Sequence, residues 1–182
     1  MNLQFNHITK RSVDLKKVED LFYQSFPKDE RLSIDLLLYK ADLGFGKLLA
    51  VYDNNSFVGF TYLVTYENLT YILYLAVDES HQSKGYGGRI LSLIKDEYCQ
   101  NQLVLNIETL DESAPNFPQR LKRKNFYNRN GYNSAKLIYK NRFGVYEVMV
   151  NGEGNVNKDT FKDLMKNFAD YSLFLYLEVE IN

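Results

Sequence analysis

The clearest pattern in the chain is a strand, a glycine-rich loop and a helix that follow one another near its middle. Large side chains alternate from Tyr71 to Val77, at positions 71, 73, 75 and 77, as they do along a β-strand. From Arg89 to Cys99 the apolar residues recur at helical spacing instead. Glycines at positions 85, 87 and 88 separate the two segments. The pattern therefore predicts a strand that turns through a flexible loop directly into an amphipathic helix.

In the remaining segments the apolar residues follow the same two patterns, alternation in strands and helical spacing in helices. Strands are expected at 5–8, 47–52, 56–66, 103–108, 134–140 and 145–150, and helices at 13–26, 33–41, before Gly131, and around 161–168. A last strand is expected where apolar residues alternate from Leu173 to Ile181. The strands ending near Val77 and Glu108 should be parallel, because a helix connects them. With no repeat in the sequence, we expect one α/β (α+β) domain spanning residues 1–182.

The composition excludes several functional classes. A net charge of −1 and a pI of about 6.1 argue against a nucleic-acid partner. No apolar run is long enough to span a membrane, and the first residues do not resemble a signal peptide, so no membrane partner is expected. A single cysteine excludes an internal disulfide, which agrees with a cytoplasmic protein. Histidine, cysteine and carboxylate residues show no metal-ligand spacing, so we expect no metal.

The glycine-rich loop has the features of an anion site. Glycine permits positive φ angles and lets a ligand approach the backbone closely. The helix that follows offers unpaired N–H groups and a positive dipole at its first turn, which bind phosphates. Lys84 and Arg89 lie at the same end of the helix. The loop matches neither the Walker sequence nor the dinucleotide fingerprint, and the alternative interpretation is an ordinary surface turn with two solvated bases.

Two segments resemble signatures of the GNAT superfamily of N-acetyltransferases. The run Val77-x-Glu79-x-x-Gln82-x-x-Gly85-x-Gly87 resembles the family's coenzyme A loop, and 126–132 resembles its second aromatic-Tyr-x-x-x-Gly-aromatic signature. The resemblance implies a mixed, mostly antiparallel twisted sheet with flanking helices and a splayed pair of parallel strands. It also implies an enzyme that transfers an acetyl group from acetyl-CoA to a primary amine, directly within a ternary complex.

The resemblance also assigns residues to the coenzyme. The pantetheine arm should lie beside Leu75, Ala76 and Val77, and the pyrophosphate against the loop residues Gln82, Ser83, Lys84, Gly85, Tyr86, Gly87 and Gly88. An N–H group near Val77 would stabilise the thioester oxygen during attack. Tyr127 is the implied general acid for the departing thiolate. The alternative for Tyr127 is an ordinary core tyrosine.

The helix before Gly131 carries two arginines on the face of Tyr127. At about 100° per residue, Arg120, Arg123 and Tyr127 share one face. Two guanidinium groups there suit a ligand that carries phosphates, so both arginines are predicted to bind the coenzyme. Many family members have Asn and Ala at these positions, and the alternative is a solvated basic face.

The sequence indicates the general base and the acceptor less clearly than the coenzyme site. Glu108, at the end of its strand, is the candidate base, with a solvated strand end as the alternative; Glu30 is a candidate for binding the substrate cation or for the base. A water chain without a dedicated base is a further possibility. The acceptor is a small-molecule or protein amine, and the last strand could pair with a second copy in a homodimer.

Two other functions compete with the enzyme. One is a catalytically inactive GNAT-fold module that binds an acyl-CoA as a sensor or partner-binding domain. The other is a nucleotide-phosphate binder of a different fold. Turnover of acetyl-CoA would distinguish the enzyme from the inactive module. Stabilisation of the protein against thermal unfolding by ATP, but not by coenzyme A, would identify the nucleotide-phosphate binder.

Overall fold

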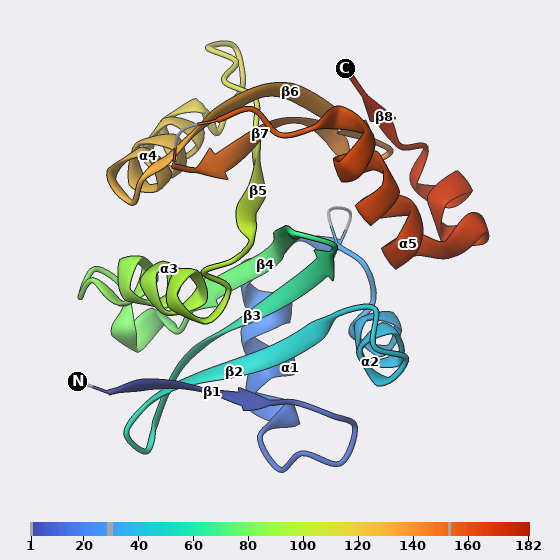
Figure 1. Ribbon diagram of the computed structural model, residues 1–182. Helices are drawn as coiled ribbons and strands as arrows, with labels where there is room; N and C mark the ends of the chain where they lie inside the picture. Colours follow the sequence, from blue (N-terminus) through green and yellow to red (C-terminus); the bar gives the residue numbers. More distant parts are fainter. Residues whose placement is uncertain (1, 29–30, 153) are drawn as a thin grey trace.

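The computed structural model describes residues 2–28, 31–152 and 154–182. These residues form one mixed sheet with helices on both faces (Figure 1). The strands, in the spatial order β1-β2-β3-β4-β5-β7-β6-β8, are β1 (Leu3–His7), β2 (Lys47–Asp53), β3 (Ser56–Tyr66), β4 (Leu69–Val77), β5 (Gln102–Glu108), β7 (Gly144–Asn151), β6 (Tyr132–Asn141) and β8 (Glu180–Ile181). The helices are α1 (Leu15–Ser25), α2 (Ile34–Asp42), η2 (Glu79–His81, a 3₁₀ turn), α3 (Tyr86–Glu97), α4 (Phe117–Arg129) and α5 (Lys158–Leu177).

Strands β4 and β5 pair in parallel, as the intervening helix predicts. The pairing runs only from Leu69 opposite Gln102 to Ile72 opposite Leu105. Every other neighbouring pair among the described strands is antiparallel. Beyond Ile72 and Leu105 the two parallel strands part, and Figure 1 shows the sheet opening at this point into two halves. The expected fold class, with its splayed parallel pair, is confirmed.

A β-bulge explains where β4 leaves β5. Tyr62 and Leu63 on β3 face Tyr74 and Ile72 on β4, which leaves Leu73 as an extra residue. A bulge bends its strand and increases its twist, and this one follows the last β4–β5 pair immediately. It also reverses the side-chain alternation, because Tyr71 and Tyr74 now point to the same face. The expected alternation through 71, 73, 75 and 77 on one face is therefore wrong.

Two apolar clusters cover the two faces of the sheet. Helices α1, α2 and α5 pack on one face, through residues such as Phe22, Leu38 and Phe161. Helix α3 covers the other face with Ile90 and Ile94, assisted by the aromatic residues of α4. Figure 1 shows α3 and α4 on the side of the molecule opposite α2 and α5. No helix among the described residues has the length and the hydrophobicity needed to cross a bilayer.

The C-terminal segment is helical, which corrects the strand expected from Leu173 to Ile181. Helix α5 continues to Leu177, and only Glu180 and Ile181 form a strand, β8, against β6. Every position from 171 to 177 except Ser172 carries a large apolar or aromatic side chain, so the segment fits the period of a strand and that of a helix equally. Burial of Leu177 in the core, with Leu173 and Phe174 packed against the same apolar cluster, decides between them.

Candidate functional site

A cleft lies between the glycine-rich loop and α4. The loop contributes Gln82, Ser83, Gly85, Tyr86, Gly87 and Gly88, and β4 contributes Val77. From α4 come Gln119, Lys122, Arg123, Phe126 and Arg129. The cleft therefore runs from the first turn of α3 to the end of β4, where the sheet opens.

Gly85 and Gly87 serve the loop in different ways. Gly85 is the N-cap of α3 and has a φ of +82°, a left-handed conformation that favours glycine. It starts the helix at Tyr86, three residues earlier than the apolar periodicity indicates. Gly87 lies inside the first turn, where an added Cβ would come within 3.0 Å of the Phe126 ring. The missing side chain at Gly87 thus lets α4 approach α3 closely.

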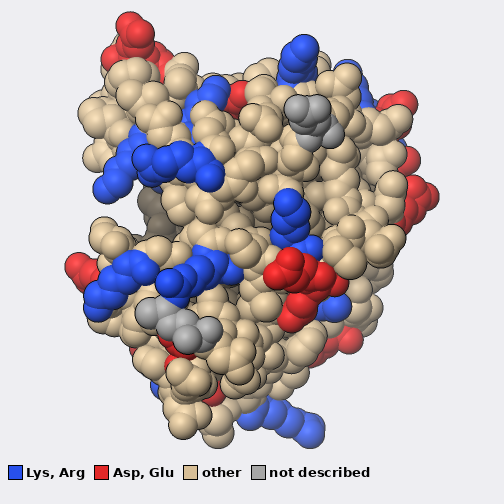
Figure 2. Space-filling model, turned by 60° about the vertical axis from the view of Figure 1, so that its left-hand side comes forward, with Lys and Arg blue, Asp and Glu red and all other residues tan. Residues whose placement is uncertain are grey.

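The cleft is positively charged. Lys122, Arg123 and Arg129 line it from α4, opposite the N-terminal end of α3. Figure 2, which turns the α3 and α4 side of the molecule forward, shows a hollow with Lys and Arg side chains above and below it. Three cations and the positive end of a helix dipole together favour a ligand with several negative charges.

Local hydrogen bonds hold the loop in shape. Asp78 caps η2 by accepting from the Ser80 N–H at 3.0 Å and from the Ser80 hydroxyl. The hydroxyl bond, and after it the N–H bond, lowers the pKa of the Asp78 carboxyl. The Gln82 side chain donates to the Val77 carbonyl at 3.1 Å, and Lys84 donates to the Ser80 carbonyl at 2.8 Å. Lys84 is thus drawn back to the loop, and it is not among the residues that line the cleft.

A second cavity lies on the other face of the sheet, on the far side of the opening between β4 and β5. It encloses about 820 Å³, including open solvent at its mouth. Tyr71, Leu73 and Tyr74 line it from β4, and Asn106 and Glu108 line it from β5. The rest of its wall comes from Phe26 and Leu32 near α1, from the β6–β7 hairpin (Tyr139, Asn141, Phe143, Tyr146), and from α5 (Met165, Phe168, Leu177).

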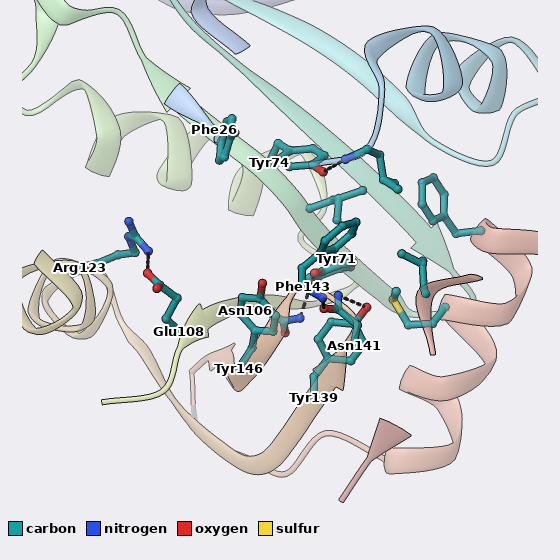
Figure 3. Close-up of a pocket in the computed structure, with 15 residues that line it drawn as sticks. Phe26, Tyr71, Tyr74, Asn106, Glu108, Arg123, Tyr139, Asn141, Phe143 and Tyr146 are labelled. Atoms are coloured by element: carbon teal, nitrogen blue, oxygen red, sulfur yellow. Dashed lines mark hydrogen bonds and ion pairs between the residues drawn. The ribbon is translucent and has the colours of Figure 1, made fainter. Parts of the chain in front are cut away.

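The cleft and the cavity adjoin at Arg123, which lines both. Its guanidinium contacts Glu108 Oε2 at 2.7 Å (Figure 3). Arg120 contacts the other oxygen, Oε1, at 3.1 Å, and Asn116 donates to the same oxygen at 3.0 Å. Arg120 also donates to the Thr109 carbonyl at 2.8 Å, which ties α4 to the end of β5. The Glu108 carboxylate therefore lies where the two spaces meet.

Comparison with known proteins points to one family. The model of the acetyltransferase (GNAT) domain matches residues 45–134. A GNAT-family acetyltransferase from Bacteroides thetaiotaomicron superposes with a TM-score of 0.75 at 24% identity, covering 90% of this chain and 94% of its own. The chain belongs to the GNAT acetyltransferase superfamily.

Two further GNAT structures share the fold at lower identity. One is an acetyltransferase from Elizabethkingia anophelis with acetyl-CoA bound, at 19% identity, a TM-score of 0.59, and coverage of 84% of this chain and 99% of its own. The other is the aminoglycoside 6'-N-acetyltransferase from Enterococcus faecium, at 16% identity, a TM-score of 0.60, and coverage of 85% and 99%. No curated protein matches the chain.

Tyr127, the implied acid of this GNAT protein, lies in the second apolar cluster. Its ring packs edge-on against Phe126 at 5.1 Å and Tyr132 at 5.9 Å between centroids. Burial raises the pKa of Tyr127, so the phenol keeps its proton. Tyr127 does not line the cleft or the cavity among the described residues, but the adjacent Phe126 does line the cleft.

Only some of the other residues expected to bind the coenzyme line the cleft. Val77 and six of the loop residues line the cleft, whereas Leu75 and Ala76 lie on the part of β4 that has left β5. Arg120 lines a neighbouring pocket beside the cavity and binds Glu108, so the guanidinium expected at the phosphates is held by a carboxylate. Glu30 lies outside the described residues.

Several lining residues carry no signal in the sequence. Lys122 and Arg129 belong to a basic helix whose exposed face could equally be solvated. The tyrosines of the cavity come from β4 (Tyr71, Tyr74) and from the β6–β7 hairpin (Tyr139, Tyr146), which are far apart in the chain. The tyrosine-rich composition was the available hint, and it indicates no position. Within the described ranges, no group of three or more His, Cys, Asp or Glu is placed to hold a metal ion.

Proposed function

We propose that this protein is an acetyl-CoA-dependent N-acetyltransferase that transfers the acetyl group to a primary amine directly, in a ternary complex. The observation that carries the proposal is the junction at Arg123, where a basic cleft meets a separate cavity across the opening between β4 and β5. Direct transfer requires that donor and acceptor bind at the same time with their reacting ends in contact. Two adjoining spaces on opposite faces of the sheet meet that requirement.

The residues of the cleft fit coenzyme A. The first turn of α3 and the cations Lys122 and Arg129 suit the diphosphate. The backbone of β4 from Leu73 to Val77 has no β5 partner, so its polar groups on that edge suit the amides of the pantetheine arm. The relative from Elizabethkingia anophelis holds acetyl-CoA, which supports the same ligand here.

The chain offers groups for both proton transfers. Acetyl-CoA supplies an acetyl thioester, and in the transfer a bond forms from the amine nitrogen to the carbonyl carbon while the carbon–sulfur bond breaks. Glu108 takes a proton from the amine, and Tyr127 donates one to the departing sulfur. Among the described residues, Oε1 of Glu108 accepts from two donors and Oε2 from one, so one lone-pair position on Oε2 remains for the amine.

Coenzyme binding tests the proposal first. Acetyl-CoA should raise the thermal midpoint of the protein. Arg129→Glu should weaken that binding about tenfold or more, because it reverses a charge that lines the cleft. Lys95→Glu is the matched control, since Lys95 is an exposed cation on α3 away from the cleft. An unchanged midpoint at saturating acetyl-CoA would contradict the proposal.

Turnover distinguishes the enzyme from an inactive acyl-CoA-binding module. Tyr127→Phe should lower kcat by about 100-fold while the affinity for coenzyme A is retained, because only the donated proton is lost. Release of free thiol in the presence of amines measures this. Equal turnover would remove Tyr127 from the mechanism, and tight coenzyme binding without thiol release would favour the sensor.

A further inference from the structure

Aromatic and aliphatic side chains make up most of the lining of the acceptor cavity. Seven of the fifteen described residues that line it are Phe or Tyr, and four more are Leu or Met. Figure 3 shows Phe26, Tyr71 and Tyr74 on one side of the space and Tyr139 and Tyr146 on the other, with the Arg123–Glu108 pair at one end. A cavity lined in this way binds a planar apolar group most favourably when that group packs between the aromatic rings.

The cavity offers little charge to a polycation. Glu108 and Arg123 are the two charged residues among the described lining, and they contact each other at 2.7 Å. Within the described part of the wall these two charges cancel, and Glu108 offers its one remaining position to a single ammonium group. Any further ammonium group of a polyamine or aminoglycoside would have to leave water among aromatic rings without a partner, which costs free energy.

The polar groups deeper in the cavity are few and uncharged. The phenol oxygens of Tyr71, Tyr74 and Tyr139 each accept one N–H bond at 3.0 Å. Burial raises the pKa of Tyr74 and Tyr139 to about 12, so these phenols remain neutral. Asn106 Oδ1 is buried without a hydrogen-bonding partner among the described residues.

The cavity is closed at the end away from the cleft. Helix α5 places Met165, Phe168 and Leu177 across this end. An extended peptide would need a groove that continues beyond the reacting amine, whereas this space ends at α5. Both α5 and most of the β6–β7 hairpin lie outside residues 45–134, where the family model matches, so the family match by itself does not define this wall.

From these observations we infer that the acceptor is a compact arylalkyl monoamine, with its amine at Glu108 and its ring among Tyr71, Tyr74, Tyr139 and Tyr146. The inference rests on the proposed function and narrows it. The ammonium group binds the free position on Glu108 before it loses its proton, and the ring occupies the aromatic part of the cavity. Polycationic and peptide acceptors are disfavoured by the same geometry.

A panel of amines tests the inference on the full chain. Thiol release from acetyl-CoA is measured with phenethylamine, tyramine and tryptamine, and with spermidine, kanamycin and a short peptide with a free N-terminus. We expect kcat/KM to be at least about tenfold higher for the arylalkylamines. Higher kcat/KM for the polycations or the peptide overturns the inference, and so does a failure of every arylalkylamine to react.

Substitution of a residue that lines the cavity tests whether the amine binds there. Phe143 lies half-buried in the β6–β7 turn, and its N–H bond to Asn141 does not involve the ring. Phe143→Ala should raise KM for the arylalkylamine about five- to tenfold and leave KM for acetyl-CoA unchanged. Tyr171→Ala, at an exposed position of α5 outside the cavity, is the control and should change neither. An unchanged KM in Phe143→Ala also overturns the inference.

Different results would contradict the acceptor class and the proposed function. A thermal shift with acetyl-CoA together with turnover of spermidine or of the peptide alone leaves the proposed function intact and contradicts the acceptor class. Absence of any shift with acetyl-CoA contradicts the proposed function, and the acceptor class with it.

Discussion

At the scale of single residues, Glu108 is the most constrained group in the site. It lies at the end of β5, where that strand has parted from β4, and the side chain is only 17% exposed. Both of its oxygens are bound by α4, one by Arg120 and the other by Arg123. Paired charges with several hydrogen bonds fix a carboxylate in one position, which a catalytic base requires.

Glu108→Gln removes the negative charge of this group while keeping its size and position. The amide keeps the size of the side chain and one oxygen that accepts from arginine, but it cannot take a proton from the amine. We expect kcat to fall by about 100-fold while the affinity for acetyl-CoA is retained. Steady-state kinetics and a thermal shift titration measure the two effects.

Glu147→Gln is the matched control for this prediction. Glu147 on β7 also binds α4, through Lys124 at 2.6 Å, and it is similarly buried, with 13% of its side chain exposed. It lines none of the spaces described above. If both variants lost the same activity, Glu108 would only hold α4 in place.

At the scale of elements, α5 depends on a kink at Asp170. The backbone there has a φ of 58° and a ψ of 179°, a region that residues other than glycine rarely occupy. Asp170 Oδ2 contacts Lys40 Nζ at 2.7 Å, and Oδ1 accepts from the Leu173 N–H at 3.1 Å. The Lys40 side chain is 2% exposed, so its ammonium group needs this partner. The kink turns the last part of α5 toward Leu177 and β8.

Asp170→Asn should lower the free energy of unfolding by about 2 kcal/mol, because Lys40 loses a charged partner while the cap on Leu173 can be kept. The Lys40 contact lowers the pKa of Asp170. The contribution is therefore present above the ordinary carboxyl pKa and is lost as the pH falls through the lower folded value. Urea unfolding at pH 7 and near pH 3 measures the difference between the variant and the parent protein, which should shrink in acid.

Glu180→Gln provides the comparison for Asp170. It breaks an exposed pair with Lys140 at 3.3 Å, in which both side chains are about half exposed. Exposed pairs contribute only about 0–1 kcal/mol. Equal losses in the two variants would show that burial of Lys40 does not matter.

At the scale of the whole molecule, buried tyrosines distinguish this protein. The chain has fifteen tyrosines and no tryptophan, and many of them lie in the two apolar clusters. Burial raises the pKa of Tyr71, Tyr127 and Tyr132 as well as those of Tyr74 and Tyr139. Each of these phenols holds its proton more tightly in the folded state than in the unfolded chain.

The protein should therefore lose stability steeply in alkali. A raised folded pKa contributes stability that is complete below about pH 10 and is lost as the pH rises toward 12. Tyr74 and Tyr139, with pKa values of about 12, account for roughly 2 kcal/mol each over this range. Urea unfolding at a series of pH values measures the loss.

Tyr139→Phe tests whether buried phenols cause this loss. The variant has one fewer group to ionise, so its free energy of unfolding should fall less between pH 10 and 12. Tyr171→Phe, at a residue that is 79% exposed, should follow the parent protein. Parallel curves for all three proteins would contradict the explanation.

The order of strands and helices, the parallel pair, and the glycine-rich loop before α3 are all readable in the sequence. They depend on neighbouring residues: the positive φ at Gly85, the alternation of strands and the helical spacing of apolar residues. The resemblance of residues 77–87 and 126–132 to the GNAT signatures is local for the same reason, and the family it implies is confirmed. Tyr127 and Glu108 as catalytic residues stay predictions.

Tertiary structure alone decided the rest. The bulge at Leu73 reverses the faces of β4 because β3 must pair on one side while β5 departs on the other. The segment from 171 to 177 fits a strand or a helix in isolation, and packing on the sheet selects the helix. The cavity beside Glu108 is built from residues between Phe26 and Leu177, and no pattern of neighbouring residues can encode which distant side chains will share a wall.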